Sequence, residues 1–387
     1  MSSTILLPRI LQVGGDASRS VGDVVKTLGC RAPLIITDRV MVSLGYVEGI
    51  QACLEEAGIP SAVFDATVPE PNEGSIVAGV EMARQGNFDC LIAIGGGSPI
   101  DSAKAIGILA KHGGKMADYK FPRSVSEAGL PIVAIPTTAG TGSEMTRFTI
   151  ITDDNTDEKM LCVGLGFLPQ AALVDYRLTL SLPPRVTADT GIDALTHAIE
   201  SYVSKKANAY SDSQALAALR LIGPNLRTVY SDGSNEAARE AMMMGATLAG
   251  AAFSAASVAL VHGMSRPIGA HFHVPHGMSN AMLLPSVTEF SIPSARARYA
   301  QCARAMGVAS EGDGDEAATQ KLMEELHSLN EQCQVPTPAQ FGIDKKTYFD
   351  KLGLMAEQAQ ASGSPGNNPR VPSIEEMVSL YSELWVD

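Results

Sequence analysis

The chain has 387 residues, a hydrophobic content of 45% and a formal net charge of −13. This length favours two domains over one simple core. The acidic balance disfavours nucleic acid and anionic lipid as partners, so an anionic ligand has to be held locally by backbone amides or a few cations. The six scattered cysteines lack a CxxC motif and indicate reduced packing residues in a cytoplasmic protein, rather than disulfides or a zinc site. No signal peptide is expected, because no basic segment precedes an apolar run at the N-terminus.

The first half of the chain alternates short apolar runs with segments of helical periodicity. Several runs are apolar throughout, which is typical of a parallel sheet covered by helices on both faces. The predicted strands are residues 33–37, 62–64, 88–94, 131–135 and 171–174. The predicted helices are 40–57, 73–85 and 99–111. Two further runs, 146–152 and 160–163, flank a polar turn at 153–157 and predict a β-hairpin appended to the sheet.

The pattern changes at Leu182-Pro183-Pro184, after which no convincing strand pattern occurs. We therefore expect an α/β domain over residues 1–182 and an all-helical domain over 183–387. Residues 241–261 carry no charge, but their many small side chains predict a closely packed buried helix ending at His262 rather than a membrane span. The predicted helices of this half are 187–203, 209–227, 236–261, 295–306, 315–329, 346–360 and 374–384.

A glycine-rich loop follows the third predicted strand and opens a helix. Three consecutive glycines, Gly95 to Gly97, let backbone amides approach a ligand, and the helix start favours a phosphate. We expect Ser98 as the N-cap, with Pro99 at the first helical position and Asp101 completing a capping box. A well-capped turn alone would explain Ser98 and Asp101 but not the three glycines, so we favour binding of a dinucleotide pyrophosphate.

The order of these motifs departs from the usual dinucleotide fingerprint. There the ribose-binding acid follows the glycines by about 20 residues, whereas here the candidate acid, Asp38, ends the first predicted strand and precedes them. A second loop, residues 136–144, follows the next strand with several glycines and hydroxyls. It is a candidate for the other side of the same crevice, and an ordinary Gly/Thr turn is the alternative.

One carboxylate and three imidazoles are spaced so that a single divalent metal could collect them. Asp193 and His197 are four residues apart and share a face if the segment is helical, whereas His262 and His276 reach that face only by folding. Such a set of nitrogen and oxygen donors suits Fe, Zn, Co or Ni. Histidine is scarce, with 7 in the chain, and four lie between 262 and 276. Unrelated surface or core histidines are therefore the weaker interpretation.

On these motifs the chain resembles the iron-containing (group III) alcohol dehydrogenases, within the dehydroquinate-synthase-like fold, along nearly its whole length. The resemblance implies an α/β NAD-binding N-terminal domain with a mainly parallel sheet, an all-α C-terminal metal-binding domain, and a site in the cleft between them. It implies Fe²⁺, with Zn²⁺ as an alternative, held by Asp193, His197, His262 and His276. The motifs that carry the resemblance are Gly95 to Lys104, residues 136–144, Gly191 to Glu200, and His262 to Gly277.

The resemblance also assigns roles in cofactor binding. A carboxylate at Asp38 would accept from the ribose 2′-hydroxyl and repel a 2′-phosphate, so NAD is expected rather than NADP. Lys159, otherwise interpreted as a solvated charge, would lie near the nicotinamide ribose. A homo-oligomer is also implied. The remaining implied cofactor contacts are Gly96, Gly97 and Ser98 at the pyrophosphate, Thr137, Thr138 and Thr141 on the nicotinamide side, and Asp101 within the glycine-loop motif.

One residue departs from the family pattern. Many members carry a further histidine four residues after the third ligand, where this chain has Arg266. Arg266 is a candidate for holding a substrate carboxylate, and pairing with a neighbouring carboxylate to shape the loop is the alternative. His271 and His273 are candidates for a proton relay, and packing beside the cleft is equally compatible with the sequence.

The expected activity is hydride transfer between NAD(H) and a small alcohol or aldehyde, with an ω-hydroxy acid or its semialdehyde, such as 4-hydroxybutyrate or 5-hydroxyvalerate, as a candidate substrate. A hydroxyacid–oxoacid transhydrogenase is the alternative. A metal- and NAD-dependent lyase of the dehydroquinate-synthase type is less favoured, because the helical half lacks an obvious basic cluster. A non-catalytic NAD-binding protein would leave the Asp and three His without a purpose.

Overall fold

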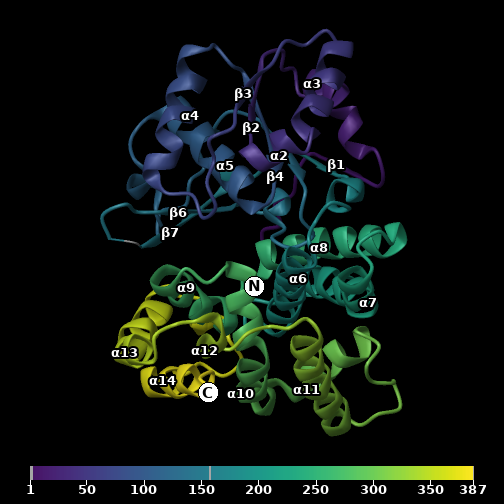
Figure 1. Cartoon of the computed structure of the whole chain (residues 1–387), viewed down its shortest axis with the longest axis vertical. Coiled ribbons are helices and arrows are strands. Elements are labelled where there is room, and N and C mark those ends of the chain that lie inside the picture. The colour runs from purple at the N-terminus through teal and green to yellow at the C-terminus, as the bar shows by residue number, and fades with distance from the viewer. Residues whose placement is uncertain (1–2, 157, 387) are drawn as a thin grey trace. The chain divides into compact units, whose positions relative to one another are not determined.

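The computed structural model describes residues 3–156 and 158–386 (Figure 1). The chain divides into two compact units. The α/β unit spans Ile5–Ser181, and the helical unit begins at Leu182 and also takes in Ser3 and Thr4.

A six-stranded parallel sheet forms the centre of the α/β unit, with strand order β1-β8-β5-β4-β2-β3. In the register of its middle strands, Ile92 lies between Ile35 and Val133. The five predicted strands are all present within two residues, whereas β1 was not predicted because its four residues are only half-buried at the sheet edge. The strands are β1 Ile10–Val13, β2 Pro33–Ile36, β3 Ala62–Phe64, β4 Cys90–Gly95, β5 Ile132–Pro136 and β8 Ala171–Val174.

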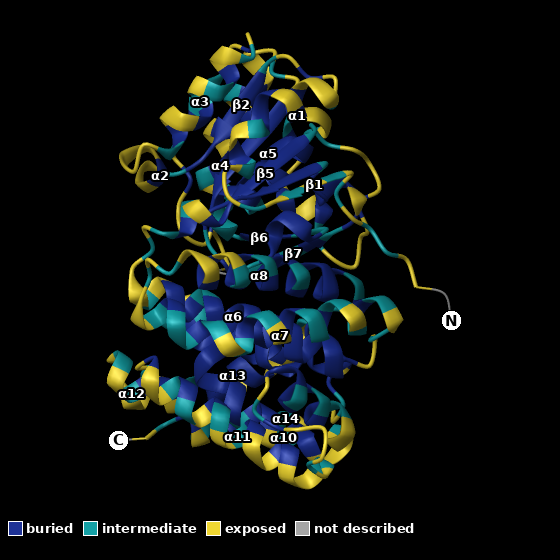
Figure 2. Cartoon of the chain, turned by 90° about the vertical axis from the view of Figure 1, so that its right-hand side faces the viewer, coloured by how far each residue is buried: buried dark blue, intermediate teal, exposed yellow. Residues whose placement is uncertain are grey.

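Helices cover both faces of this sheet, as its apolar strands require (Figure 2). Leu91 and Ala93 of β4 pack with α4 and α5, and the alternate residues Ile92 and Ile94 pack with α1 and α3. The predicted helix 40–57 is wrong as a single element, because Gly45 has a left-handed φ of 76° and divides it into α2 and α3. The helices are α1 Val21–Thr27, α2 Arg39–Ser43, α3 Tyr46–Glu56, α4 Glu73–Gln85 and α5 Gly97–His112.

The predicted hairpin is present as β6 (Phe148–Thr152) and β7 (Lys159–Val163), but it forms a separate two-stranded antiparallel sheet. The expectation that it extends the main sheet is therefore wrong. Its anchor is a helix: Thr149 Oγ1 donates to the Asp101 carbonyl, and Ile150 N donates to Asp101 Oδ2 in α5. Asp157, at the end of the predicted turn, lies outside the described residues.

The helical unit contains no strand among its described residues. Helix α6 lies at its centre, where it is buried almost throughout and packs against α7, α8 and α10. Helix α10 is kinked at Ala295, so the predicted helix 295–306 corresponds to its second part. The helices are α6 Pro184–Val203, α7 Ala209–Ser231, α8 Glu236–Ala256, α9 Leu260–Phe272, α10 His276–Ala305, α11 Asp315–Gln332, α12 Pro338–Phe341, α13 Lys345–Ala361 and α14 Ile374–Glu383.

The chain turns sharply between α8 and α9, whose axes are bent by 103°. Ser257 has a φ of 62° at this break, so the predicted helix that ended at His262 is wrong. His262 instead lies in the first turn of α9. Among the described residues, no single helix is long and apolar enough to cross a membrane, and one bent pair, α8 with α9, meets that test by length and composition alone.

Candidate active site

The structure brings together all four side chains predicted to bind a metal. Asp193 Oδ1 lies 3.4 Å from His262 Nε2, 3.7 Å from His276 Nε2 and 3.8 Å from His197 Nε2. Four donors at about 2.1 Å from one ion in a tetrahedron are about 3.4 Å apart. The ligand atoms of Asp193, His262 and His276 all lie within 4.8 Å of one another and fit a divalent metal with small adjustments, and His197 lies beside them through its 3.8 Å approach to Asp193.

Three separate helices supply these four residues. Asp193 and His197 occupy successive turns of the buried helix α6, which confirms the shared face expected from their spacing. His276 begins α10, where a Cβ on the adjacent Gly277 would lie only 2.2 Å from the Asp189 carbonyl oxygen. The glycine therefore lets the start of α10 pack directly against α6, one turn before Asp193.

Glu200, two turns after Asp193 on α6, fixes the orientation of His262. Its Oε2 lies 2.7 Å from His262 Nδ1, and its two oxygens accept from the backbone amides of Ala259 and Val261. A carboxylate on the far nitrogen of a metal-ligating imidazole sets the tautomer and raises ligand basicity. Glu200 follows Asp193 by seven residues in the sequence. This spacing was visible, but it did not by itself predict a role for Glu200.

Asn280 lies within the same cluster and was not predicted. Its Nδ2 donates to Asp193 Oδ1 at 2.7 Å and lies 3.2 Å and 3.3 Å from the Nε2 atoms of His262 and His276. Its buried Oδ1 has no hydrogen-bond partner among the described residues. The amide therefore contacts three of the donor atoms, and only the four-residue spacing from His276 hinted at this position.

The electrostatics of the cluster favour a cation. Burial would raise the pKa of Asp193, but His197, His276 and His262 lower it more, so this pKa lies well below its usual range. Burial would lower the pKa of His262, but its hydrogen bonds to Asp193 and Glu200 raise that pKa to about 8. Positive charge is thus stabilised where the two carboxylates face the imidazoles.

Arg266 follows His262 by one turn of α9. Its Nη1 donates to Ser364 Oγ at 3.1 Å, whereas its buried Nε has no partner among the described residues. Burial lowers the pKa of Arg266, and the Glu200 charge opposes that shift. Among residues 3–156 and 158–386, no carboxylate lies within 4.0 Å of the guanidinium, so it contacts the loop before α14 without forming an ion pair there.

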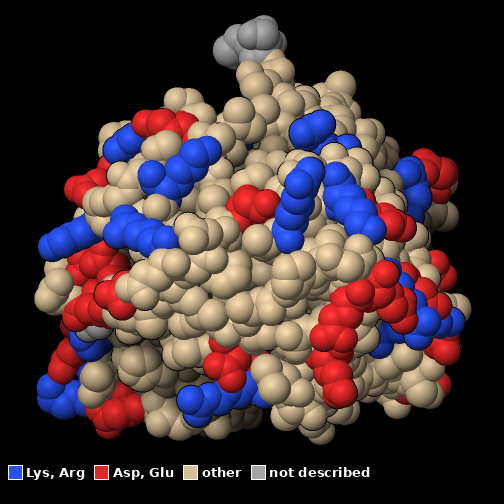
Figure 3. Space-filling model, turned by 90° about the horizontal axis from the view of Figure 1, so that it is seen from above, with Lys and Arg blue, Asp and Glu red and all other residues tan. Residues whose placement is uncertain are grey.

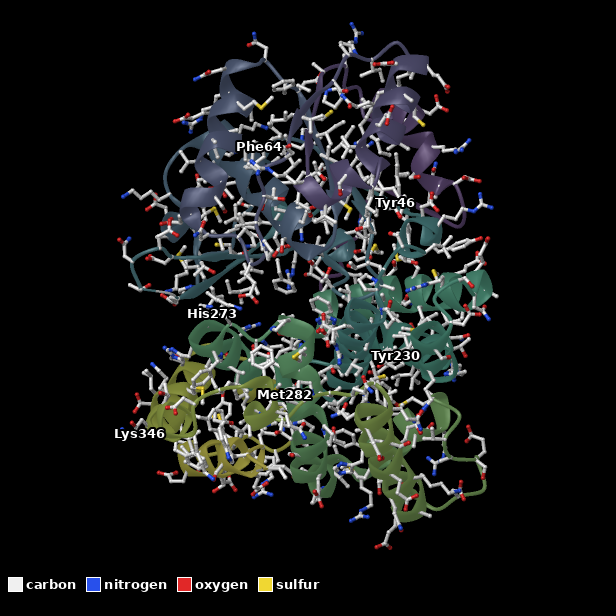
Figure 4. All side chains as sticks on the ribbon, viewed as in Figure 1. Tyr46, Phe64, Tyr230, His273, Met282 and Lys346 are labelled. Carbon is white, nitrogen blue, oxygen red and sulfur yellow. The ribbon has the colours of Figure 1, made fainter. Side chains whose placement is uncertain are left out.

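The structure places His271 and His273 outside the four-residue cluster. His271 Nε2 lies 2.8 Å from Gln358 Oε1 in α13. His273 is exposed, with a left-handed φ of 55°, at the C-terminal end of α9 (Figure 4). Their role in proton relay stays a prediction.

The glycine loop begins α5 in a different way from the one predicted. The N-cap is Gly96 and it makes no side-chain cap, so Ser98 is not the N-cap and Asp101 does not complete a capping box. Ser98 Oγ instead accepts from Glu70 N, and Asp101 accepts from Ser143 Oγ and Ile150 N. Because no side chain caps this helix, its first amides are available to an anion.

The two predicted nucleotide loops meet at the carboxyl ends of β4 and β5. A Cβ on Gly96 would lie 3.4 Å from Thr138 Cγ2, and one on Gly97 would lie 2.9 Å from Thr141 Cγ2. Thr137 N donates to the Gly95 carbonyl. Thr138 Oγ1 is buried without a partner among the described residues, which leaves a hydroxyl for a ligand. The close approach and this hydroxyl fit a nucleotide held mainly by backbone.

Asp38 and Lys159 both have structural partners in the α/β unit. Asp38 Oδ1 caps α2 by accepting from Val40 N and Met41 N. Lys159 Nζ lies 2.8 Å from Glu70 Oε2, and Glu70 N reaches Ser98, so Lys159 is connected to the glycine loop. Figure 3 shows acidic and basic side chains interspersed on one face of the molecule, in keeping with local rather than patch-based binding of an anion.

Comparison with known proteins identifies the class. Residues 8–176 match the iron-containing alcohol dehydrogenase family, and residues 187–385 match the C-terminal part of the Fe-containing alcohol dehydrogenase family. The chain therefore belongs to the iron-containing alcohol dehydrogenases. It is an oxidoreductase, and Fe²⁺ and NAD, expected from the sequence, are supported as its cofactors.

Individual relatives cover the whole chain. Lactaldehyde reductase of Escherichia coli (strain K12) is 36% identical over 389 residues, covering 100% of both chains. The crystal structure of a 1,3-propanediol oxidoreductase superposes with a TM-score of 0.95 at 34% identity and covers 100% of both chains. A sulfoacetaldehyde reductase from Bifidobacterium kashiwanohense, in complex with NAD⁺, has a TM-score of 0.89 at 27% identity and covers 99% of each chain.

Proposed function

We propose that this alcohol dehydrogenase interconverts a small ω-hydroxy acid and its semialdehyde, such as 4-hydroxybutyrate or 5-hydroxyvalerate, with NAD(H) as the hydride carrier. In this proposal residues 1–182 bind NAD and residues 183–387 bind Fe²⁺. The single observation that carries the choice of substrate is Arg266, a guanidinium one turn after His262 with a buried, unpartnered Nε among the described residues.

The energetics of Arg266 support an anionic substrate group. A buried N–H without a partner costs about 1–3 kcal/mol, and a carboxylate can relieve this cost through a bidentate pair with the guanidinium. Ser364 occupies only Nη1. The relative named sulfoacetaldehyde reductase acts, by its name, on an aldehyde that carries an anionic sulfonate. That name shows that an anionic aldehyde is compatible with this fold.

The remaining parts of the proposal follow from the cluster and the loops. Bound Fe²⁺ would supply Lewis-acid polarisation of the substrate oxygen, and bound NAD would supply the hydride acceptor. Asp193, His197, His262 and His276 would hold the ion, and Glu200 would keep the His262 imidazole in one tautomer.

The nucleotide would lie on the backbone amides of Gly96 and Gly97. Thr137, Thr138 and Thr141 would line its nicotinamide side, and Asp38 would select against a 2′-phosphate.

The test compares 4-oxobutyrate with butanal, an uncharged aldehyde of the same chain length. Arg266→Ala should lower kcat/KM for 4-oxobutyrate by about 10–100-fold, because a charge-assisted hydrogen bond contributes about 1.5–3 kcal/mol. The value for butanal should stay within about twofold. Arg266→Lys should recover part of the loss, since it keeps the charge but not the bidentate geometry.

A second role for Arg266 gives a different outcome. If the guanidinium mainly balances the Glu200 charge, Arg266→Ala would change iron binding and would change the activity on both aldehydes equally. Iron content, measured beside the two kcat/KM values, therefore separates the two roles. Oxidation of a hydroxy acid by an oxo acid without added NAD would indicate the transhydrogenase instead.

A further inference from the structure

A second group of metal-ligating side chains lies in the α/β unit, at the end of β4 opposite the glycine loop. Cys30, Asp89 and Cys90 each offer a ligand atom, and these atoms all lie within 4.8 Å of one another. Cys30 follows α1, and Cys90 begins β4. The sequence spacing of 59 and 60 residues hid this proximity. Both thiols are free and buried, in agreement with the interpretation of the cysteines as reduced packing residues.

The backbone holds the three residues in place without any ion. Asp89 Oδ2 accepts from Arg31 N, Asp89 Oδ1 accepts from Ala32 N, and Asp89 N donates to the Ala32 carbonyl. In the parallel register, Pro33 of β2 lies opposite Cys90. The residues directly after Cys30 are therefore fastened to the start of β4, beside the thiol pair.

The chemistry of these donors selects a thiophilic cation. Thiolates prefer Zn²⁺ and similar soft or borderline ions, and a Zn–S bond of about 2.3 Å separates two sulfurs on a tetrahedral ion by about 3.8 Å. The present limit of 4.8 Å requires a contraction of about 1 Å at most. We propose that Cys30, Cys90 and Asp89 form a binding site for a thiophilic divalent cation of the Zn²⁺ class.

Binding at this site exchanges protons for the ion. Burial raises the pKa of the Cys90 thiol, and Cys30 and Asp89 raise it further, so both thiols are protonated before the ion arrives. Uptake forms two metal–sulfur bonds and one metal–oxygen bond, and it releases two protons to solvent. Three protein ligands leave one position of a tetrahedron for water.

The position of the site determines what the ion can affect. Cys90 and Gly95 are the two ends of β4, and five residue steps of about 3.3 Å place them roughly 17 Å apart. An ion at Cys90 would therefore fasten the loop of residues 30–32 to the sheet, and it would not touch the glycine loop. The expected consequence is greater thermal stability of the α/β unit with unchanged turnover.

Titration of the full-length, iron-loaded enzyme with Cd²⁺ tests the proposal. The predicted metal set of the active site contains no sulfur, so an ultraviolet thiolate-to-cadmium charge-transfer band reports binding to cysteine, and the cysteine variants assign it to a site. We expect the band to saturate at one Cd²⁺ per chain. Cys30→Ser and Cys90→Ser should each abolish it, and Cys162→Ser should keep it, because Cys162 is an equally buried strand thiol outside the cluster.

Cys30→Ser guards against misfolding, because Cys30 lies in a loop and is slightly exposed, whereas Cys90 is fully buried in the sheet. Zn²⁺ should raise the Tm of the iron-loaded enzyme and of Cys162→Ser, but not of Cys30→Ser. Absence of the band, or its persistence in both cluster variants, would overturn the proposal. Loss of two thiols to a disulfide oxidant such as diamide, with no band on Cd²⁺ addition, would show a redox pair instead. None of these readouts depends on which aldehyde the enzyme reduces.

Discussion

The glycine loop of the α/β unit and the metal cluster of the helical unit present different chemical groups to a ligand. The loop presents backbone amides, which three consecutive glycines expose, and its side chains mainly support the turn. The cluster presents charged and aromatic side chains from three helices, and each is held by a further side chain or a tight helix contact, which for His197 is stacking on Phe253. A phosphate site of this kind is specified locally, whereas a metal site is specified by tertiary packing.

The largest expected effect removes one charge from the cluster. Asp193→Asn keeps the shape of the side chain but takes away an anion worth several kcal/mol to a bound cation, so kcat/KM should fall on the order of 10³-fold. Iron content should fall in parallel. Asp189→Asn is the matched control, because Asp189 is buried on the same helix but pairs with Arg185. Full iron content and activity in Asp193→Asn would contradict the assignment of the ligand.

The loop region also contains a buried cation, Lys104, and its titration can be detected by a pH series. Burial lowers the pKa of Lys104 from 10.5 to about 8. Below pH 8 both folded and unfolded states carry this proton, and between pH 8 and 10.5 the unfolded state binds more protons. The free energy of unfolding should therefore rise across this window, by up to about 3 kcal/mol.

Lys104→Gln supplies the control for that pH dependence. Glutamine retains a donor for Ser143 and Thr146 but does not titrate, so its unfolding free energy should lack this rise. Denaturant unfolding at several pH values measures both proteins. An equal slope in the two would show that other groups cause it.

A smaller effect is expected where a side chain acts only through another. Glu200→Gln should weaken metal affinity by about 10–100-fold, because the amide no longer stabilises the donor form of His262 Nδ1–H as a carboxylate does. Competition with a chelator measures the affinity directly. The KM for NAD should not change. A rise in that KM of similar size would contradict the view that the metal cluster and the glycine loop act separately.

The smallest effect is expected for one methyl group in the glycine loop. Gly97→Ala places a Cβ 2.9 Å from Thr141 Cγ2, and relieving such crowding costs about 1–3 kcal/mol. The KM for NAD should rise on the order of tenfold while iron affinity is unchanged. Gly353→Ala in α13 is the control, since its Cβ would meet nothing within 4 Å. An unaltered KM would mean that the backbone of this loop does not contact the cofactor.

The difference between local and tertiary specification also explains which features could be predicted from the sequence. The apolar strands and the glycine loop were predicted because their signals are contiguous, and the wrong details are local ones. Ser98 failed as an N-cap because the helix begins at Gly97, two residues earlier than predicted, and Gly45 divided a predicted helix by adopting a left-handed conformation. The edge strand β1 has only four residues, one of them Gln12, which is too short a run to stand out.

Only part of the metal cluster could be predicted from the sequence. The four-residue spacing identified Asp193 and His197 as a pair, and the scarcity of histidine pointed to His262 and His276. Asn280 and the contact between Glu200 and His262 depend on how α6, α9 and α10 pack, which no local pattern records. The break at Ser257 was missed for the same reason, because the uncharged run continues across it.

That break has a consequence for how occupancy of the site can be observed. The carboxylate of Glu200 closes the turn between α8 and α9 by accepting from Ala259 N and Val261 N, and it also forms a hydrogen bond with the His262 ring. Filling the site therefore tightens this turn, and amide hydrogen exchange at these two positions should slow. Deuterium uptake at these two amides would therefore report how much iron is bound before any substrate is added.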